Sequence, residues 1–277
     1  MAIKRSASTR SRHRRARTGP KPATNRPRHG LARVLSKLGV CSRTRAQALI
    51  AAGRVHVDGA IVLDPETPID VAEARIAVDG AEVAGAAKVY LMLNKPRGYV
   101  TTASDERGRD TVYSLLQGAN AAACGSGWLA PVGRLDKASE GLLLLTNDSA
   151  WSACLTDPAS HLDKTYHVQV DAVPDVVLLQ RLRDGIDDNG ERLSVKSVRE
   201  LRRGEKNAWL EIVLDEGRNR QIRRLLAAFD ISVLRLVRVA IGPLELGDLA
   251  KGRCRRLGTE EVATLAQASA VGASGRE

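Results

Sequence analysis

Aromatic residues and cysteines are scarce in this sequence. Its 277 residues include one Phe, four Tyr and three Trp, so the core must consist mainly of Leu, Val, Ile and Ala. The four cysteines are widely spaced and form no C-x-x-C pair, which disfavours a zinc site, a redox motif or a disulfide framework. Reduced thiols that serve as small apolar residues are the preferred interpretation.

Long apolar runs are missing as well. No stretch approaches the roughly 20 apolar residues that span a bilayer. No apolar segment follows the basic N-terminus, as it would in a secretory signal. We therefore expect a cytoplasmic protein with no membrane partner.

The motifs of several enzyme classes are also lacking. The sequence contains no G-x-x-x-x-G-K-S/T phosphate loop, no H-E-x-x-H and no G-x-S-x-G, and its five histidines are scattered. These absences disfavour a metal site, a nucleotide cofactor and a serine nucleophile. We expect no metal and no small-molecule cofactor.

Positive charge is in excess but unevenly distributed. The formal net charge is +11, yet residues 1–28 hold ten Lys or Arg and no acid, so the remainder is close to neutral. We predict that 1–28 is a disordered basic tail, because its composition cannot build a core. Two local clusters of cations then follow: Arg33, Lys37, Arg43, Arg45 and Arg54, and Arg218, Arg220, Arg223 and Arg224. Such clusters indicate a polyanionic partner, most commonly nucleic acid, whereas a solubilising role would explain the tail alone.

A change in apolar period predicts a small unit at 29–84. Leu31, Val34, Leu35 and Leu38 fit one face of a helix that Gly39 would end, and a second helix follows Ser42 as its N-cap. Two short alternating runs with Asp-Gly turns then predict hairpins.

A larger unit is predicted at 87–260. Its strands are expected at 89–93, 141–146, 165–171, 208–214 and 233–240, and its helices at 111–117, 149–156, 175–183 and 219–229. Because strands and helices do not alternate regularly, we predict an α+β fold with a mixed, mainly antiparallel sheet. Residues 261–277 are predicted to be a flexible C-terminal tail.

The segment 133–148, GRLDKASEGLLLLTND, is the most informative candidate for chemistry. It places Asp136 in a loop that leads into a very apolar strand, where a side chain can be held at the edge of a cleft. A single Asp in a loop is more commonly a turn former or a cap. The neighbouring Arg134 and Glu140 favour a functional cluster.

Three other segments carry cations beside turns or strands. In 216–226, EGRNRQIRRLL, Arg220 and Arg224 would share a helix face with Arg223 beside them, either as a solvated surface or to grip a carboxylate and phosphates. Lys164 precedes Tyr166 at a strand start, where the ring could stack on a base or be half-buried. The tight turn KPRG at 95–98 would expose Lys95 and Arg97 at its rim, which suits either a phosphate contact or an ordinary turn.

Together these segments resemble the bacterial ribosomal-RNA pseudouridine synthases of the RsuA/RluB group. The resemblance covers about 29–260 and rests on GRLDKASEGLLLLTND, KPRG, KTY at 164–166 and EGRNRQIRRL at 216–225, in the family's order. Ser149 stands where Gly is more usual and Leu225 where Met is common. The unit at 29–84 resembles the alpha-L (S4-like) RNA-binding motif that precedes the catalytic domain in this family.

The resemblance implies a role for each matching residue. Asp136 matches the essential aspartate, Tyr166 the tyrosine that stacks on the target uracil, and Arg223 the arginine that pairs with the aspartate. Arg134 matches the residue that helps to displace the target base. The remaining cations of the motifs and of the small unit are expected to contact RNA: Lys95, Arg97, Lys164, Arg220, Arg224, Arg33, Lys37, Arg43, Arg45 and Arg54.

The expected function is therefore isomerisation of a ribosomal uridine to pseudouridine by a monomeric enzyme active in ribosome biogenesis. Large-subunit RNA is favoured over small-subunit RNA because the pattern is closer to the RluB type. One alternative is a non-enzymatic RNA-binding or ribosome-assembly factor, which would not need Asp136, Tyr166 and Arg223 together. Another is a glycoside hydrolase using Asp136 and Glu140 as a carboxylate pair, which the scarcity of aromatics disfavours.

Overall fold

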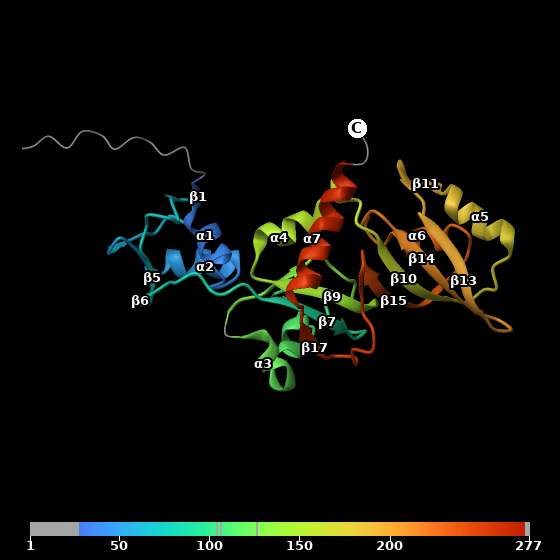
Figure 1. Cartoon of the computed structure of the whole chain (residues 1–277), viewed down its shortest axis with the longest axis horizontal. Coiled ribbons are helices and arrows are strands. Elements are labelled where there is room, and N and C mark those ends of the chain that lie inside the picture. Colours follow the sequence, from blue (N-terminus) through green and yellow to red (C-terminus); the bar gives the residue numbers. More distant parts are fainter. Residues whose placement is uncertain (1–27, 104, 106, 126, 275–277) are drawn as a thin grey trace, which may run out of the picture.

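The computed structural model describes residues 28–103, 105, 107–125 and 127–274. Figure 1 shows a small N-terminal unit in blue, followed by a larger unit that is built around one long sheet. The basic tail expected at 1–28 falls, apart from Arg28, outside the described residues. Within the described residues, no helix is both long enough and apolar enough to cross a membrane.

The N-terminal unit combines two helices with short strands, as the sequence predicts. Helix α1 (Leu31–Lys37) is followed by Gly39 at φ 76°, and Ser42 caps α2 (Arg43–Ala51) through a hydrogen bond from the N–H of Arg45. Asp-Gly turns with positive φ join two pairs of strands in a four-stranded sheet. These strands are β2 (Val55–Val57), β3 (Ala60–Ile61), β5 (Ile76–Val78) and β6 (Ala81–Glu82), while β1 (His29–Gly30) pairs with β4 (Pro68–Ile69).

A nine-stranded sheet forms the larger unit, and its order along the main path is β13-β14-β10-β15-β9-β7-β17. All neighbouring pairs are antiparallel except β15 and β9, which run parallel over only two residue pairs. The sheet thus divides into two halves that meet at a narrow junction, and the expected α+β class is confirmed. The strands of this sheet are β7 (Tyr90–Lys95), β8 (Ala130–Val132), β9 (Glu140–Thr146), β10 (Lys164–Val170), β13 (Ser197–Arg203), β14 (Ala208–Leu214), β15 (Val233–Ile241), β16 (Leu244–Glu245) and β17 (Cys254–Arg256).

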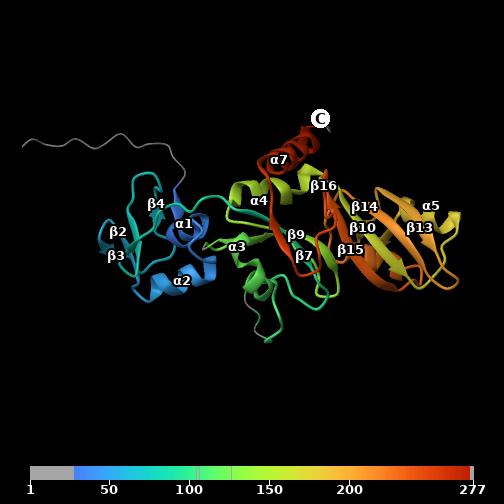
Figure 2. The same ribbon diagram turned by 60° about the horizontal axis from the view of Figure 1, so that its bottom comes forward.

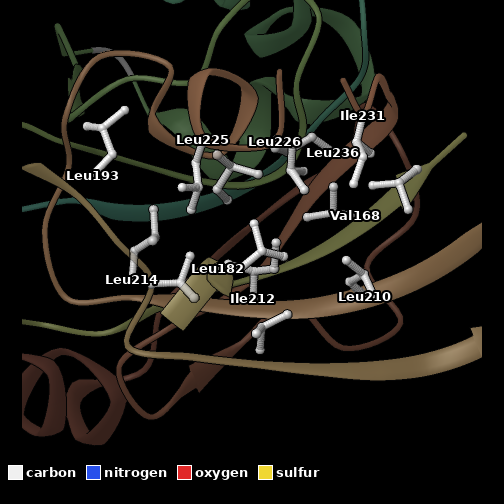
Figure 3. Packing of buried hydrophobic residues seen from close by; sticks show 14 of the residues in the cluster. Val168, Leu182, Leu193, Leu210, Ile212, Leu214, Leu225, Leu226, Ile231 and Leu236 are labelled. Atoms are coloured by element: carbon white, nitrogen blue, oxygen red, sulfur yellow. The ribbon is translucent and has the colours of Figure 1, made fainter. Parts of the chain in front are cut away.

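Helices pack on each half of the sheet. Helices α5 (Val176–Asp184) and α6 (Gln221–Ala227) bury the apolar side chains of β10 and β14, and Figure 3 shows Leu182, Leu225 and Leu226 within this cluster. Helices α4 (Ser149–Thr156) and α7 (Thr259–Ser274) bury a second cluster on β7 and β9, and Figure 2 shows α7 lying over α4. The shorter helical segments are Val112–Leu116, Gly118–Asn120, α3 (Ala121–Cys124) and Pro158–Ser160, and a separate hairpin joins β11 (Ile186–Asp188) to β12 (Glu191–Leu193).

The C-terminal segment differs from the expected flexible tail at 261–277. Its described part belongs to α7, and the Leu265 side chain is completely buried. The Nε1–H of Trp151 on α4 donates to the Val262 carbonyl at 3.2 Å. The prediction is wrong because Ala and Ser, which read as tail composition, are small enough to let α7 pack closely on its neighbours.

Candidate active site

A cleft opens beside the narrow junction between the two halves of the sheet. Its volume is about 370 Å³, and its lining comes from the loop before β9, the start of β10, the segment before α6 and part of β15. Asp136 lies in the loop between β8 and β9, and its side chain is 39% exposed to the cleft. The structure therefore places this carboxylate where the sequence predicts it, in the loop that leads into β9 and within a concave site.

Lys95 holds the backbone of the Asp136 loop through hydrogen bonds from its buried side chain. The Lys95 side chain is completely buried, and its Nζ donates to the carbonyls of Asp136 at 3.0 Å, Ser139 at 2.7 Å and Pro96 at 3.1 Å. Burial lowers the pKa of Lys95 to about 8, although the negative charges of Asp136 and Glu140 counteract the shift. The expectation that Lys95 sits exposed at a turn rim and contacts RNA is wrong, because its side chain turns inward to these carbonyls.

Two arginines lie beside Asp136, and they differ in what they contact. Arg220 Nη1 lies 3.8 Å from the Asp136 carboxylate, and both side chains are substantially exposed, so water weakens this ion pair. Arg223 instead donates to the carbonyls of Ala138 at 3.2 Å and Val233 at 3.3 Å. Burial lowers the pKa of Arg223, as does the charge of Arg220, while the charge of Asp136 raises it.

The expected pairing of Arg223 with Asp136 is therefore not formed in this structure. Its guanidinium is occupied by two backbone carbonyls, and its Nε is buried without a hydrogen-bond partner in the part of the chain that the structure describes. Arg223 still lines the same cleft as Asp136.

Helix α6 begins later than the sequence predicts, and this separates Arg220 from Arg224. Arg220 adopts a left-handed conformation with φ 49° just before the helix, so the two arginines do not share a helix face. Arg224 contacts Asp188 and Glu191 of the β11–β12 hairpin, each at 2.6 Å. Its expected role as an RNA contact is not supported, because its charge is already paired within the protein.

Tyr166 and Lys164 lie on β10 with side chains on the same face, and both line the cleft. The Tyr166 ring packs at the border of two apolar clusters, which fixes its orientation. Burial lowers the pKa of Lys164, and the charge of Arg238 lowers it further. Arg134 lines the cleft with an exposed side chain, and Arg97 is exposed close to Arg223.

Glu140 is not available as a second catalytic carboxylate. Its side chain is 5% exposed, and its oxygens accept hydrogen bonds from Arg235 at 3.1 Å and Lys251 at 2.5 Å. Burial alone would raise the pKa of Glu140, but the two cations lower it below its ordinary value. A carboxylate fixed in this way is structural, which argues against the glycoside-hydrolase alternative.

Two residues at the junction were missed by sequence reasoning. Arg238 lines the cleft although it is only 6% exposed, and its Nε donates to the Leu142 carbonyl at 2.8 Å. The signal was an arginine, one of two in β15, within an otherwise apolar run. Gly141 has φ 101°, and a Cβ there would collide with the Arg238 backbone, so only glycine lets β15 approach β9.

Of the cations expected to bind RNA in the N-terminal unit, some are exposed and others already contact side chains within the protein. Arg33, Arg43 and Arg45 are exposed on α1 and α2. Lys37 Nζ lies 2.8 Å from His29 Nε2, and Arg54 forms an ion pair of 2.5 Å with Asp79. No group of three or more His, Cys, Asp or Glu that could hold a metal occurs among the residues that the structure describes.

Comparison with known proteins gives a consistent result. Residues 89–228 match the RNA pseudouridylate synthase family, and residues 30–76 match the S4 domain. The chain is 36% identical over 228 residues to an uncharacterized RNA pseudouridine synthase of Rickettsia prowazekii, covering 82% of this chain and 93% of that protein. It is 39% identical over 239 residues to one of Mycobacterium bovis, covering 86% and 93%. A crystal structure of a pseudouridylate synthase superposes with a TM-score of 0.58 at 28% identity, covering 86% of this chain and 99% of that one.

Proposed function

The chain belongs to the RNA pseudouridylate synthase family, and from that membership we propose that it isomerises one uridine of ribosomal RNA with Asp136 as the catalytic carboxylate. RNA pseudouridine synthase activity follows from the family, and the S4 domain provides an RNA-binding module ahead of the catalytic domain. The observation that carries the proposed role of Asp136 is its position: a carboxylate at the cleft, on a loop anchored by the buried Lys95.

The reaction needs little beyond a carboxylate and a shaped site. The bond between the sugar C1′ and the uracil N1 breaks, the base turns, and a bond forms between C1′ and C5, whose proton moves to N1. No net oxidation occurs. Asp136 could act as a nucleophile at C1′ or as a base at C2′, and both routes require it to be ionised. Arg220 Nη1 lies 3.8 Å from the Asp136 carboxylate.

The other residues of the cleft support binding and orientation. The target base must leave its stack before it can react. Tyr166 lines the cleft, and in this proposal its ring holds the displaced base. Arg134 is exposed at the entrance, where it can occupy the place of the displaced base. Arg223 would approach Asp136 once RNA excludes water from the cleft.

A large-subunit ribosomal RNA is the proposed substrate. The exposed arginines of α1 and α2 supply the phosphate contacts of the N-terminal unit, together with the S4 match at 30–76. The pattern of motifs, closer to the RluB type, is the reason for proposing the large subunit. Small-subunit RNA is the alternative substrate, and the experiment below distinguishes the two substrates.

The experiment is pseudouridine mapping by carbodiimide-dependent primer extension. Large- and small-subunit ribosomal transcripts, and ribosomal assembly intermediates, are each incubated with wild type, Asp136→Asn and Asp187→Asn. Asp187 is a matched control because it is an exposed carboxylate paired with Arg192 away from the cleft. We expect a stop at one large-subunit uridine with wild type and Asp187→Asn, and none with Asp136→Asn, which keeps its RNA affinity.

Two outcomes would contradict the proposal. Near-normal modification by Asp136→Asn would remove this residue from the catalytic role. The absence of any stop on every ribosomal RNA and particle, with RNA binding intact, would favour another RNA substrate or the binding-factor alternative.

A further inference from the structure

The half of the sheet formed by β13, β14, β10 and β15 has two unlike faces. Along β14 the residues alternate strictly, so that the even-numbered ones are buried against α5 and α6, as Figure 3 shows for Leu210, Ile212 and Leu214. The odd-numbered ones, Trp209 among them, are only half-buried. The residues beside them on β10 and β13 are half-buried or exposed: Thr165, His167, Gln169, Arg199 and Arg202. Among the described residues, no helix or loop buries this second face.

An aromatic ring lies between two arginines on this face, near the first residue of β14. The strand register places Arg202 beside Trp209, Trp209 beside Gln169, and Gln169 beside Arg235. The guanidinium carbons of Arg202 and Arg235 lie 5.7 Å and 5.6 Å from the centre of the Trp209 ring. Attraction between a cation and an indole at this distance orients both partners. We call Trp209, Gln169, Arg199, Arg202 and Arg235 the tryptophan face.

Charge on and beside the tryptophan face is predominantly positive. Glu211 is paired with Arg199 at 2.6 Å, and Glu140 is shared by Arg235 and Lys251. Arg202 is exposed and has no carboxylate within ion-pair distance among the described residues. Cations therefore outnumber carboxylates here, although the body of the chain is close to neutral.

We propose that the tryptophan face binds a single-stranded segment of the substrate RNA that lies outside the target uridine. The inference rests on the proposed action on RNA. A base would stack on the exposed part of the Trp209 indole, while Arg202 contacts the adjacent phosphate. Tyr166 and Gln169 lie on opposite faces of β10, so this contact is separate from the cleft. Its contribution is to affinity and not to the chemical step.

The test compares the full chain with Arg202→Gln, Trp209→Leu and the control Arg181→Gln. Arg181 also stacks on an aromatic ring, at 4.7 Å from the centre of Phe229, but it belongs to α5 on the opposite side of the sheet. Binding of labelled polyuridylate and of ribosomal RNA transcripts is followed by fluorescence anisotropy over a range of salt concentrations. Pseudouridine formation is measured in parallel under single-turnover conditions with saturating RNA.

We expect Trp209→Leu to weaken RNA binding about fivefold or more, because one base loses its stacking partner. Arg202→Gln should also weaken binding. The slope of log K against log salt concentration should become shallower by about one, because one phosphate contact is lost. Arg181→Gln should bind as wild type, and all three variants should keep the saturated single-turnover rate. If Trp209→Leu unfolds, the exposed Arg202→Gln carries the test alone.

Wild-type affinity and salt slope in Arg202→Gln would overturn the proposal and leave the proposed function untouched. A dimer in sedimentation that Arg202→Gln or Trp209→Leu dissociates would also overturn it, because a second copy would then cover this face. If no RNA is modified but both variants still lose RNA affinity, the proposed function fails while the tryptophan face is upheld.

Discussion

Replacing Lys95 with Met tests whether this buried ammonium positions the loop that carries Asp136. The change keeps most of the side-chain volume but removes a hydrogen bond from each of three carbonyls, those of Pro96, Asp136 and Ser139. The Asp136 carbonyl still accepts from the Ser139 N–H. A buried group left without its partner costs about 1–3 kcal/mol, and removing a buried charge returns part of that cost. We expect the free energy of unfolding to fall by about 2–4 kcal/mol.

The effect on catalysis should be larger than the effect on RNA binding. A displacement of the loop by about 1 Å is enough to reduce the rate about 100-fold. The assay is single-turnover pseudouridine formation at saturating RNA, together with RNA affinity by anisotropy and stability by urea unfolding. The control is Lys137→Met, which removes an exposed lysine from the same loop. The affinities of both variants should stay close to that of wild type.

A full single-turnover rate combined with weaker RNA binding in Lys95→Met would contradict this prediction. That result would return Lys95 to the role that the sequence predicts, a phosphate contact. A loss of rate that Lys137→Met shares would also refute it, because the effect would then not depend on the buried hydrogen bonds.

Other consequences of the structure can be measured directly. The pKa of Lys95 is lowered from 10.5 to about 8 in the folded protein, so between pH 8 and 10.5 the unfolded chain binds more protons than the folded one. The stability of wild type relative to Lys95→Met, measured by urea unfolding, should therefore rise with pH across this window. Gly141→Ala should destabilise by about 2–4 kcal/mol, because a Cβ collides with the backbone of β15, whereas Gly217→Ala, with open space around it, should be near neutral in thermal unfolding. Truncation after residue 258 removes α7 and uncovers the apolar cluster beneath it, so the melting temperature should fall by about 10 °C or more in calorimetry; an unchanged value would show that α7 does not contribute to the core.

Elements with a strong local pattern could be predicted from the sequence. Helix α4 and strand β14 lie where the sequence places them, because the Asp148 cap and the alternation in 208–214 are properties of neighbouring residues. Strand β13 was missed, since SVRELRR carries few apolar residues and depends on pairing with β14 for its conformation. Helix α7 was missed for a similar reason: its burial comes from tertiary packing.

The candidate site was predicted at the level of segments, and the side-chain contacts were not. The motif segments do converge on one cleft around Asp136. Residue type alone suggested that Lys95 and Arg224 were exposed cations, but one is buried under the loop and the other is paired with two carboxylates. The left-handed conformation of Arg220 could not be read from its sequence context either.

The narrow junction between the halves of the sheet has a consequence for the order in which the protein is assembled. The half containing β10, β13, β14 and β15 is continuous in the chain from 164 to 241, so it can close as soon as it is synthesised. The half that carries Asp136 needs β17 to pair with β7, and α7 to pack on α4. Chains are synthesised from the N-terminus and their domains generally fold as units. We therefore expect the loop that carries Asp136 to be completed last, after the C-terminal helix has emerged from the ribosome.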